Sequence, residues 1–150
     1  MRRTVAPLLL TLVCVAALNG CRRNDRQGGS YMDVSGDVSV DAVIRQLGEF
    51  TNELAGKVES ATDPKAGVAE AQRLLDARKA ELSARISALK QGALAADASA
   101  RGKWLEAEVD NTQRVSELKL KHLDASLRDP ELKAALEKLA ADYDSLYKDR

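Results

Sequence analysis

Apolar residues recur every three or four positions from Ser39 to the end of the chain, and this spacing constrains the fold more than any other feature. A helix with 3.6 residues per turn gathers such residues on one face, whereas a half-buried strand needs alternation at every second residue. We therefore expect four amphipathic helices, one for each of four successive stripes. In chain order the stripes are Val43, Leu47, Phe50, Leu54 and Val58; Val68, Ala71, Leu75, Leu82, Ile86 and Leu89; Leu105, Val109, Thr112, Leu120, Leu123 and Leu127, widened by Trp104, Val115 and Leu118; and Leu132, Leu136, Leu139, Tyr143 and Leu146.

Local signals predict where these helices begin and end. Asp63-Pro64 and Asp129-Pro130 each place a carboxylate at an N-cap, followed by a proline whose missing N–H is harmless at the first helical position. Gly92 is predicted to close the second helix in the left-handed conformation, and Asp97 or Ser99 to cap the third. The expected helices span 39–61, 64–91, 98–127 and 130–148.

Short connections favour antiparallel neighbours, so we expect an all-α fold, a small antiparallel bundle of four helices. Leu, Ile, Val and Phe together supply only 27 of the 130 residues after Gly20, and alanine supplies another 21. Alanine favours helix but buries little apolar area, so this composition predicts a thin core that is marginally stable or completed by a partner.

The first twenty residues have the three parts of an export signal. A basic start, Met1-Arg2-Arg3, is followed by the apolar run from Val5 to Leu18 and then by Gly20-Cys21. The run is shorter than the roughly 20 apolar residues that a membrane-spanning helix needs, so a permanent transmembrane anchor is disfavoured.

The segment Leu18-Asn19-Gly20-Cys21 resembles the lipobox of bacterial lipoproteins. The resemblance implies cleavage before Cys21, attachment of diacylglycerol to its thiol and acylation of the new amine. It further implies that the protein is anchored in the outer membrane, because Arg22 replaces the aspartate that retains such proteins at the inner membrane. The expected domains are a cleaved signal peptide over 1–20, a lipidated tether over 21–38 and a helical bundle over 39–150.

Glycine, serine and short polar side chains fill residues 22–38 without helical periodicity, which is typical of a flexible tether. Arg22, Arg23 and Arg26 either contact anionic headgroups or remain solvated, and the sequence leaves both readings open.

Candidate catalytic and metal-binding residues are few. His122 is the only histidine, and one imidazole among lysines predicts neither a metal site nor a haem site. Carboxylates two residues apart, such as those from Glu106 to Asp110 and at Asp142 and Asp144, point to different sides of a helix and read as solvated surface. We expect no catalytic, cofactor-binding or metal-binding residue, and Cys21 as the lipid attachment site.

Two further sets of residues concern surfaces. Trp104, Tyr143 and Tyr147 either mark an interaction patch or seal the ends of the bundle. Acidic-then-basic pairs four residues apart are typical of water-facing helix surfaces. These pairs are Glu81/Arg85, Asp110/Arg114 and Glu117/Lys121.

The leading functional hypothesis is a non-enzymatic, lipid-anchored lipoprotein that faces the periplasm and acts as an envelope scaffold, adaptor or pilot-like binding module. Its predicted partners are the membrane, through acylated Cys21, and an envelope protein that the sequence does not identify. Nucleic acid is not expected, because 23 basic residues balance 23 acidic ones and only 3% of residues are aromatic. The alternative is a helical lipoprotein that binds a small apolar ligand or a client protein within its alanine-rich bundle.

Overall fold

The computed structural model describes residues 39–148, which form helices joined by short connections and contain no strand. The signal peptide, Cys21 and the tether predicted from the sequence lie outside the described residues. The all-α class is confirmed. In chain order the helices are α1 (Val40–Glu59), α2 (Pro64–Gln91), α3 (Ala93–Ala96), α4 (Ala98–Lys121), α5 (Leu123–Arg128) and α6 (Pro130–Asp144).

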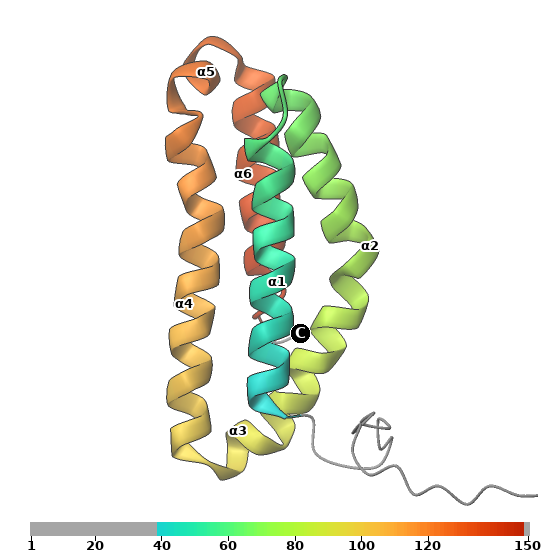
Figure 1. Ribbon diagram of the computed structural model, residues 1–150, viewed down its shortest axis with the longest axis vertical. Coiled ribbons are helices and arrows are strands. Elements are labelled where there is room, and N and C mark those ends of the chain that lie inside the picture. Colours follow the sequence, from blue (N-terminus) through green and yellow to red (C-terminus); the bar gives the residue numbers. More distant parts are fainter. Residues whose placement is uncertain (1–38, 149–150) are drawn as a thin grey trace, which may run out of the picture. The chain divides into compact units, whose positions relative to one another are not determined.

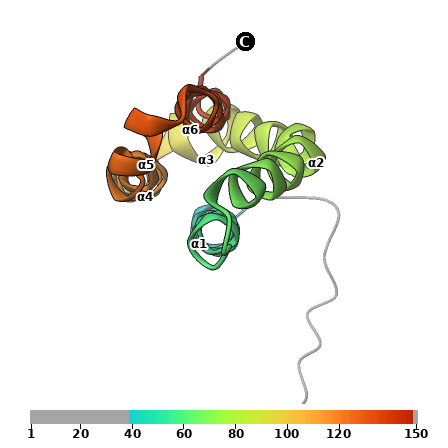
Figure 2. The ribbon, with the colours of Figure 1, turned by 90° about the horizontal axis from the view of Figure 1, so that it is seen from above.

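The four long helices, α1, α2, α4 and α6, form an up-and-down bundle in which each runs opposite to the long helix before it (Figure 1). Seen along their length, α1 packs against α2 and α4, and α6 packs against the same two helices (Figure 2). None of the described helices combines the length and the apolar character needed to cross a bilayer.

Aspartates cap three of the long helices. The Oδ1 atom of Asp63 accepts a hydrogen bond from the backbone N–H of Lys65 at 3.0 Å, and that of Asp129 accepts one from Glu131 at 2.9 Å. Asp97 caps α4 in the same way. The two Asp-Pro corners are therefore confirmed as helix starts, and each carboxylate satisfies an amide that the first helical turn leaves without a partner.

The second boundary differs from the prediction. Gly92 ends α2 with φ −105° and ψ −103°, so it is not left-handed, and its N–H bonds back to the carbonyl groups of Ala88 and Leu89. The chain then forms the single turn α3 before Asp97 begins α4, so the connection is itself partly helical.

The predicted third helix, 98–127, was wrong as a single element. It is interrupted at His122, where α4 ends and the short helix α5 begins. The interruption lets α5 pack against α6. The last helix is also shorter than predicted, because α6 ends at Asp144 and residues 145–147 form turns.

Three of the four predicted apolar stripes form the core. Every member of the first, second and fourth stripes is buried, among them Leu54, Leu75 and Tyr143, which are completely inaccessible. Five members of the third stripe are exposed instead of buried, and they form the surface described next.

Candidate interaction surface

Helix α4 has two apolar faces, and the sequence prediction assigned the wrong one to the core. Trp104, Val115 and Leu118, predicted only to widen the stripe, are 4%, 2% and 0% exposed. Five residues predicted to form the stripe itself are exposed instead. They are Leu105 (59%), Val109 (59%), Leu120 (72%), Leu123 (50%) and Leu127 (72%).

We call these five residues the α4–α5 row. At 3.6 residues per turn, the α4 members of the row lie about 140° around the helix from the buried face made by Trp104, Val115 and Leu118. That angle is too wide for one helix to bury both faces against α1 and α6. The larger side chain of Trp104 favours burial of its own face, because burying more apolar area gives more stabilisation.

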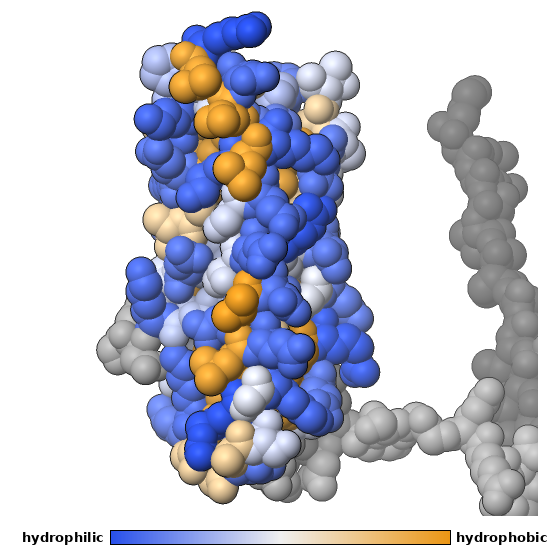
Figure 3. Space-filling view, turned by 90° about the vertical axis from the view of Figure 1, so that its left-hand side faces the viewer, coloured by the Kyte–Doolittle hydropathy of each residue, from blue (hydrophilic) through white to orange (hydrophobic). Residues whose placement is uncertain are grey.

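The row forms two groups of apolar atoms, one towards each end of this side of the bundle, with polar atoms between them (Figure 3). Thr112 and Ser116 occupy the intervening helical positions. Isolated exposed leucines are ordinary, but a row of this kind on an otherwise packed bundle is typical of an interaction site.

Charged side chains flank the row unevenly along its length. Glu106, Glu108 and Asp110 stand beside its beginning, and Lys119 and Lys121 stand beside its end in α4. Glu108 accepts a hydrogen bond from the indole N–H of Trp104 at 3.1 Å. The surface is therefore acidic near Val109 and basic near Leu120.

Glu59 of α1 joins α1 to α4 through Arg114 and Lys121. Its carboxylate lies 2.8 Å from the Arg114 guanidinium and 3.2 Å from Nζ of Lys121. The hydrogen bond from Arg114 is the main reason that the pKa of Glu59 is lowered, and Lys121 lowers it further.

These contacts partly revise the predicted pairs four residues apart. Glu81 and Arg85 do pair, at 3.3 Å. Arg114 and Lys121 instead turn to Glu59, since that carboxylate lies on the neighbouring helix within reach of both cations.

Trp104, Tyr143 and Tyr147 are buried together in the core, so they do not form an exposed patch, and Tyr143 lies against Phe50 in the middle of α1 rather than at an end of the bundle. The Trp104 and Tyr147 ring centroids are 5.9 Å apart, those of Tyr143 and Tyr147 are 5.8 Å apart, and Phe50 stacks on Tyr143. The Tyr143 hydroxyl bonds to that of Thr51 and lies 3.2 Å from that of Tyr147. Burial is the largest cause of the raised pKa of both tyrosines.

His122 lies at the junction of α4 and α5 rather than on the flank of a continuous helix. Its Nε2 atom is buried and has no hydrogen-bond partner among the described residues. No three His, Cys, Asp or Glu side chains of the described residues come close enough together to hold a metal ion.

The acidic residues considered in the sequence do not form a joint site. Asp142 pairs with Lys138 and Lys79, and its pKa is lowered chiefly by the hydrogen bond from Lys138. Glu108 binds Trp104, as described above, while Glu106 and Asp110 are exposed.

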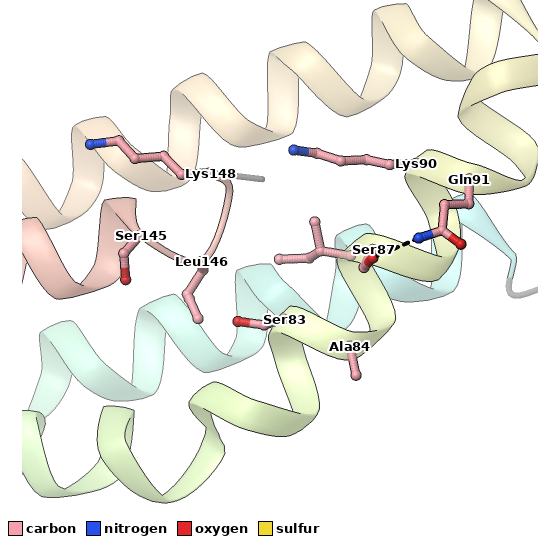
Figure 4. A pocket seen from close by; sticks show the side chains of 9 residues that line it. Ser83, Ala84, Ser87, Lys90, Gln91, Ser145, Leu146 and Lys148 are labelled. Atoms are coloured by element: carbon pink, nitrogen blue, oxygen red, sulfur yellow. Dashed lines mark hydrogen bonds between the residues drawn. The ribbon is translucent and has the colours of Figure 1, made fainter. Parts of the chain in front are cut away.

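Several hollows lie along the described surface. One, of about 490 Å³, lies between α2 and the end of the chain and is lined by Ile86 and Leu146 together with serines, lysines and Gln91 (Figure 4). Two others border the row. One of about 400 Å³ is lined by Leu94, Arg101, Trp104 and Leu105 among others, and one of about 100 Å³ by Lys119, Leu123 and Leu136 among others.

No protein-family model, no curated protein and no solved structure matches this chain.

Proposed function

We propose that this chain is a non-enzymatic lipoprotein, anchored by acylated Cys21 to the periplasmic face of the outer membrane, whose bundle works as a scaffold, adaptor or pilot-like binding module. The observation that carries the proposal is the α4–α5 row, which keeps five large apolar side chains at half exposure or more. Leaving them in water forgoes roughly 1 kcal/mol or more for each side chain that a contact would cover. A partner that covers the row would recover that free energy.

The thin core supports the same proposal. Four leucines and one valine lie on an exposed face, although large apolar residues are scarce in this chain. Because solvent-facing positions are satisfied equally well by polar residues, an apolar row of this length indicates a requirement other than folding.

Anchoring is tested by fractionating cells that express the full chain and by mass spectrometry of the membrane-extracted protein. We expect loss of residues 1–20 and an added lipid mass on Cys21, and we expect Cys21→Ser to leave the membrane fraction. Cys14→Ser is the matched control, because Cys14 belongs to the segment that is removed. An intact Met1 terminus would refute the anchor.

Contact through the row is tested by photo-cross-linking in intact cells. A photoreactive amino acid at Leu120 should form a covalent adduct, whereas the same amino acid at Ala80, an exposed position of α2, should form much less. If neither position forms an adduct, the row is not a contact surface and the proposed function fails.

A further inference from the structure

We propose that the α4–α5 row is the contact surface between two copies of this chain, whose α4 helices lie antiparallel across a two-fold axis near residue 114. This inference rests on the proposed function, since it names the occupant of the same surface. Three independent features of the row favour a second copy of the chain: its spacing, its flanking charges and the hollows at its ends.

The spacing is symmetric about residue 114. Within α4, Thr112 and Ser116 lie two residues on either side, and Val109 and Leu120 lie five and six residues away. Leu105 and Leu123, the first residue of α5, lie nine residues on either side. When two such helices run antiparallel, Leu105 meets Leu123 of the second copy, and Val109 meets Leu120. Small hydroxyl side chains meet near the axis, where the two helices approach most closely. An isologous contact requires this kind of self-complementary surface.

The charges beside the row match in the same register. Glu108 faces Lys119 of the second copy along one flank. Glu106 faces Lys121 along the other, where Lys121 also lies 3.2 Å from Glu59 of its own chain. Asp110 and Glu117 face one another as like charges, but the Arg114 guanidinium lies 3.8 Å from Glu117 and moderates their repulsion. The acidic half of each row thus lies against the basic half of the other, which favours this partner and orientation.

A parallel pair would lose this match. Glu106 would lie beside Glu108 of the second copy, and Lys119 beside Lys121, and like charges side by side oppose association. Lys103 and Arg101 are the cations of α4 that precede the acidic end, and Lys103 lies 3.2 Å from Asp41 of α1. The Arg101 guanidinium donates to the carbonyl groups of Leu94 at 2.9 Å and Ala95 at 3.2 Å.

The hollows at the two ends complete the match. The hollow of about 400 Å³ at the acidic end of the row is lined by Trp104 and Leu105 among others, and the second copy would cover it. Leu105 of the second copy comes opposite Leu123, beside the hollow of about 100 Å³. Apolar side chains that enter hollows on the facing surface are the usual anchors of an interface.

The test introduces cysteines into the full chain and oxidises intact cells mildly. Gln113→Cys lies one residue from the axis and should give a disulfide-linked dimer, whereas Ala80→Cys should not. Adding Leu120→Glu to Gln113→Cys should reduce the linked fraction by roughly tenfold or more, because the contact would then bury an unpaired charge. Adding Ala80→Glu is the matched control and should change nothing.

Two further variants test the orientation. Two copies of residue 106 lie about 24 Å apart in the antiparallel pair, at 1.5 Å per residue, so Glu106→Cys alone should not form a linked dimer. Glu106→Cys combined with Lys121→Cys should form one. Linked dimers from Glu106→Cys alone would overturn the antiparallel arrangement.

The outcomes separate this inference from the proposed function. If the photoreactive residue at Leu120 captures only a different protein and Gln113→Cys gives no more dimer than Ala80→Cys, the second copy is refuted while the contact function stands. If Leu120 captures nothing, the function fails and this inference fails with it. Thermal melting of each variant, followed by circular dichroism, verifies that the bundle is still folded.

Discussion

At Gly67 the backbones of α1 and α2 approach so closely that no side chain fits between them. A Cβ atom at this position would lie 2.7 Å from the Ala61 side chain and 2.8 Å from the backbone oxygen of Lys57. The helix-favouring effect of alanine is therefore outweighed at this one position by overlap with a neighbouring helix.

We expect Gly67→Ala to lower the free energy of unfolding by about 1–3 kcal/mol, the usual cost of overpacking. Gly56→Ala is the control, because a Cβ there meets nothing within 4 Å and alanine should gain up to about 1 kcal/mol. Denaturant unfolding followed by circular dichroism measures both. Equal effects of the two substitutions would show that the helices do not approach closely at Gly67.

The buried hydroxyl groups of Tyr143 and Tyr147 make the free energy of unfolding depend on pH in the alkaline range. Burial raises the pKa of both above the ordinary value near 10, so the folded state keeps protons that the unfolded chain loses. Their contribution is complete below about pH 10 and is lost as the pH rises further.

We therefore expect the free energy of unfolding to fall as the pH is raised above about 10, and Tyr147→Phe to make this fall less steep. Lysines also titrate in this range, and the Phe variant isolates the contribution of one tyrosine from theirs. Denaturant unfolding at successive pH values measures the slope. The same slope in the variant and the parent chain would contradict the assignment.

Among the helices, α4 offers the clearest contrast between a buried and an exposed face. Leu118 is fully buried and Leu120, two residues later, is 72% exposed. Truncating a buried leucine removes packing and leaves a cavity, whereas truncating an exposed one removes little.

We expect Leu118→Ala to cost about 2–5 kcal/mol and Leu120→Ala to change the stability of the monomer by about 0.5 kcal/mol or less. The two variants delete the same atoms from the same helix, so each controls for the other. Unfolding at low protein concentration makes the comparison. A larger loss from Leu120→Ala would mean that the helix is turned the other way.

For the whole molecule, action by contact requires an intact bundle and does not require His122. The junction of α4 and α5 places its imidazole away from any group of metal-binding side chains among the described residues. A proline at Ala84, in the middle of α2, would by contrast break a helix at a cost of about 3 kcal/mol or more.

We expect a deletion strain to be complemented by His122→Ala and not by Ala84→Pro. Immunoblots and membrane fractionation establish that each protein is present and anchored. Loss of complementation by a folded and anchored His122→Ala protein would show that the imidazole performs chemistry in the cell.

Much of this architecture follows from local signals that the sequence alone supplies. The Asp-Pro corners act through hydrogen bonds that span two or three residues, so α2 and α6 begin at the predicted residues. Three of the stripes are buried as predicted, because each helix that carries one has a single apolar face. The position of Cys21 as a lipid site depends on a resemblance in a segment outside the described residues and stays a prediction.

Only the tertiary structure decided which face of α4 is buried and where that helix ends. Periodicity reports that a face is apolar, but it does not report which neighbour covers it. Both apolar faces of α4 satisfy a helical repeat, and packing against α1 and α6 selected the one that contains Trp104 and Leu118. No glycine or proline marks the break at His122 in the sequence. After the break α5 packs against α6, and this tertiary contact is not visible in the local sequence. The row that remains exposed is therefore a property of the assembled bundle, which no single stripe of the sequence could reveal.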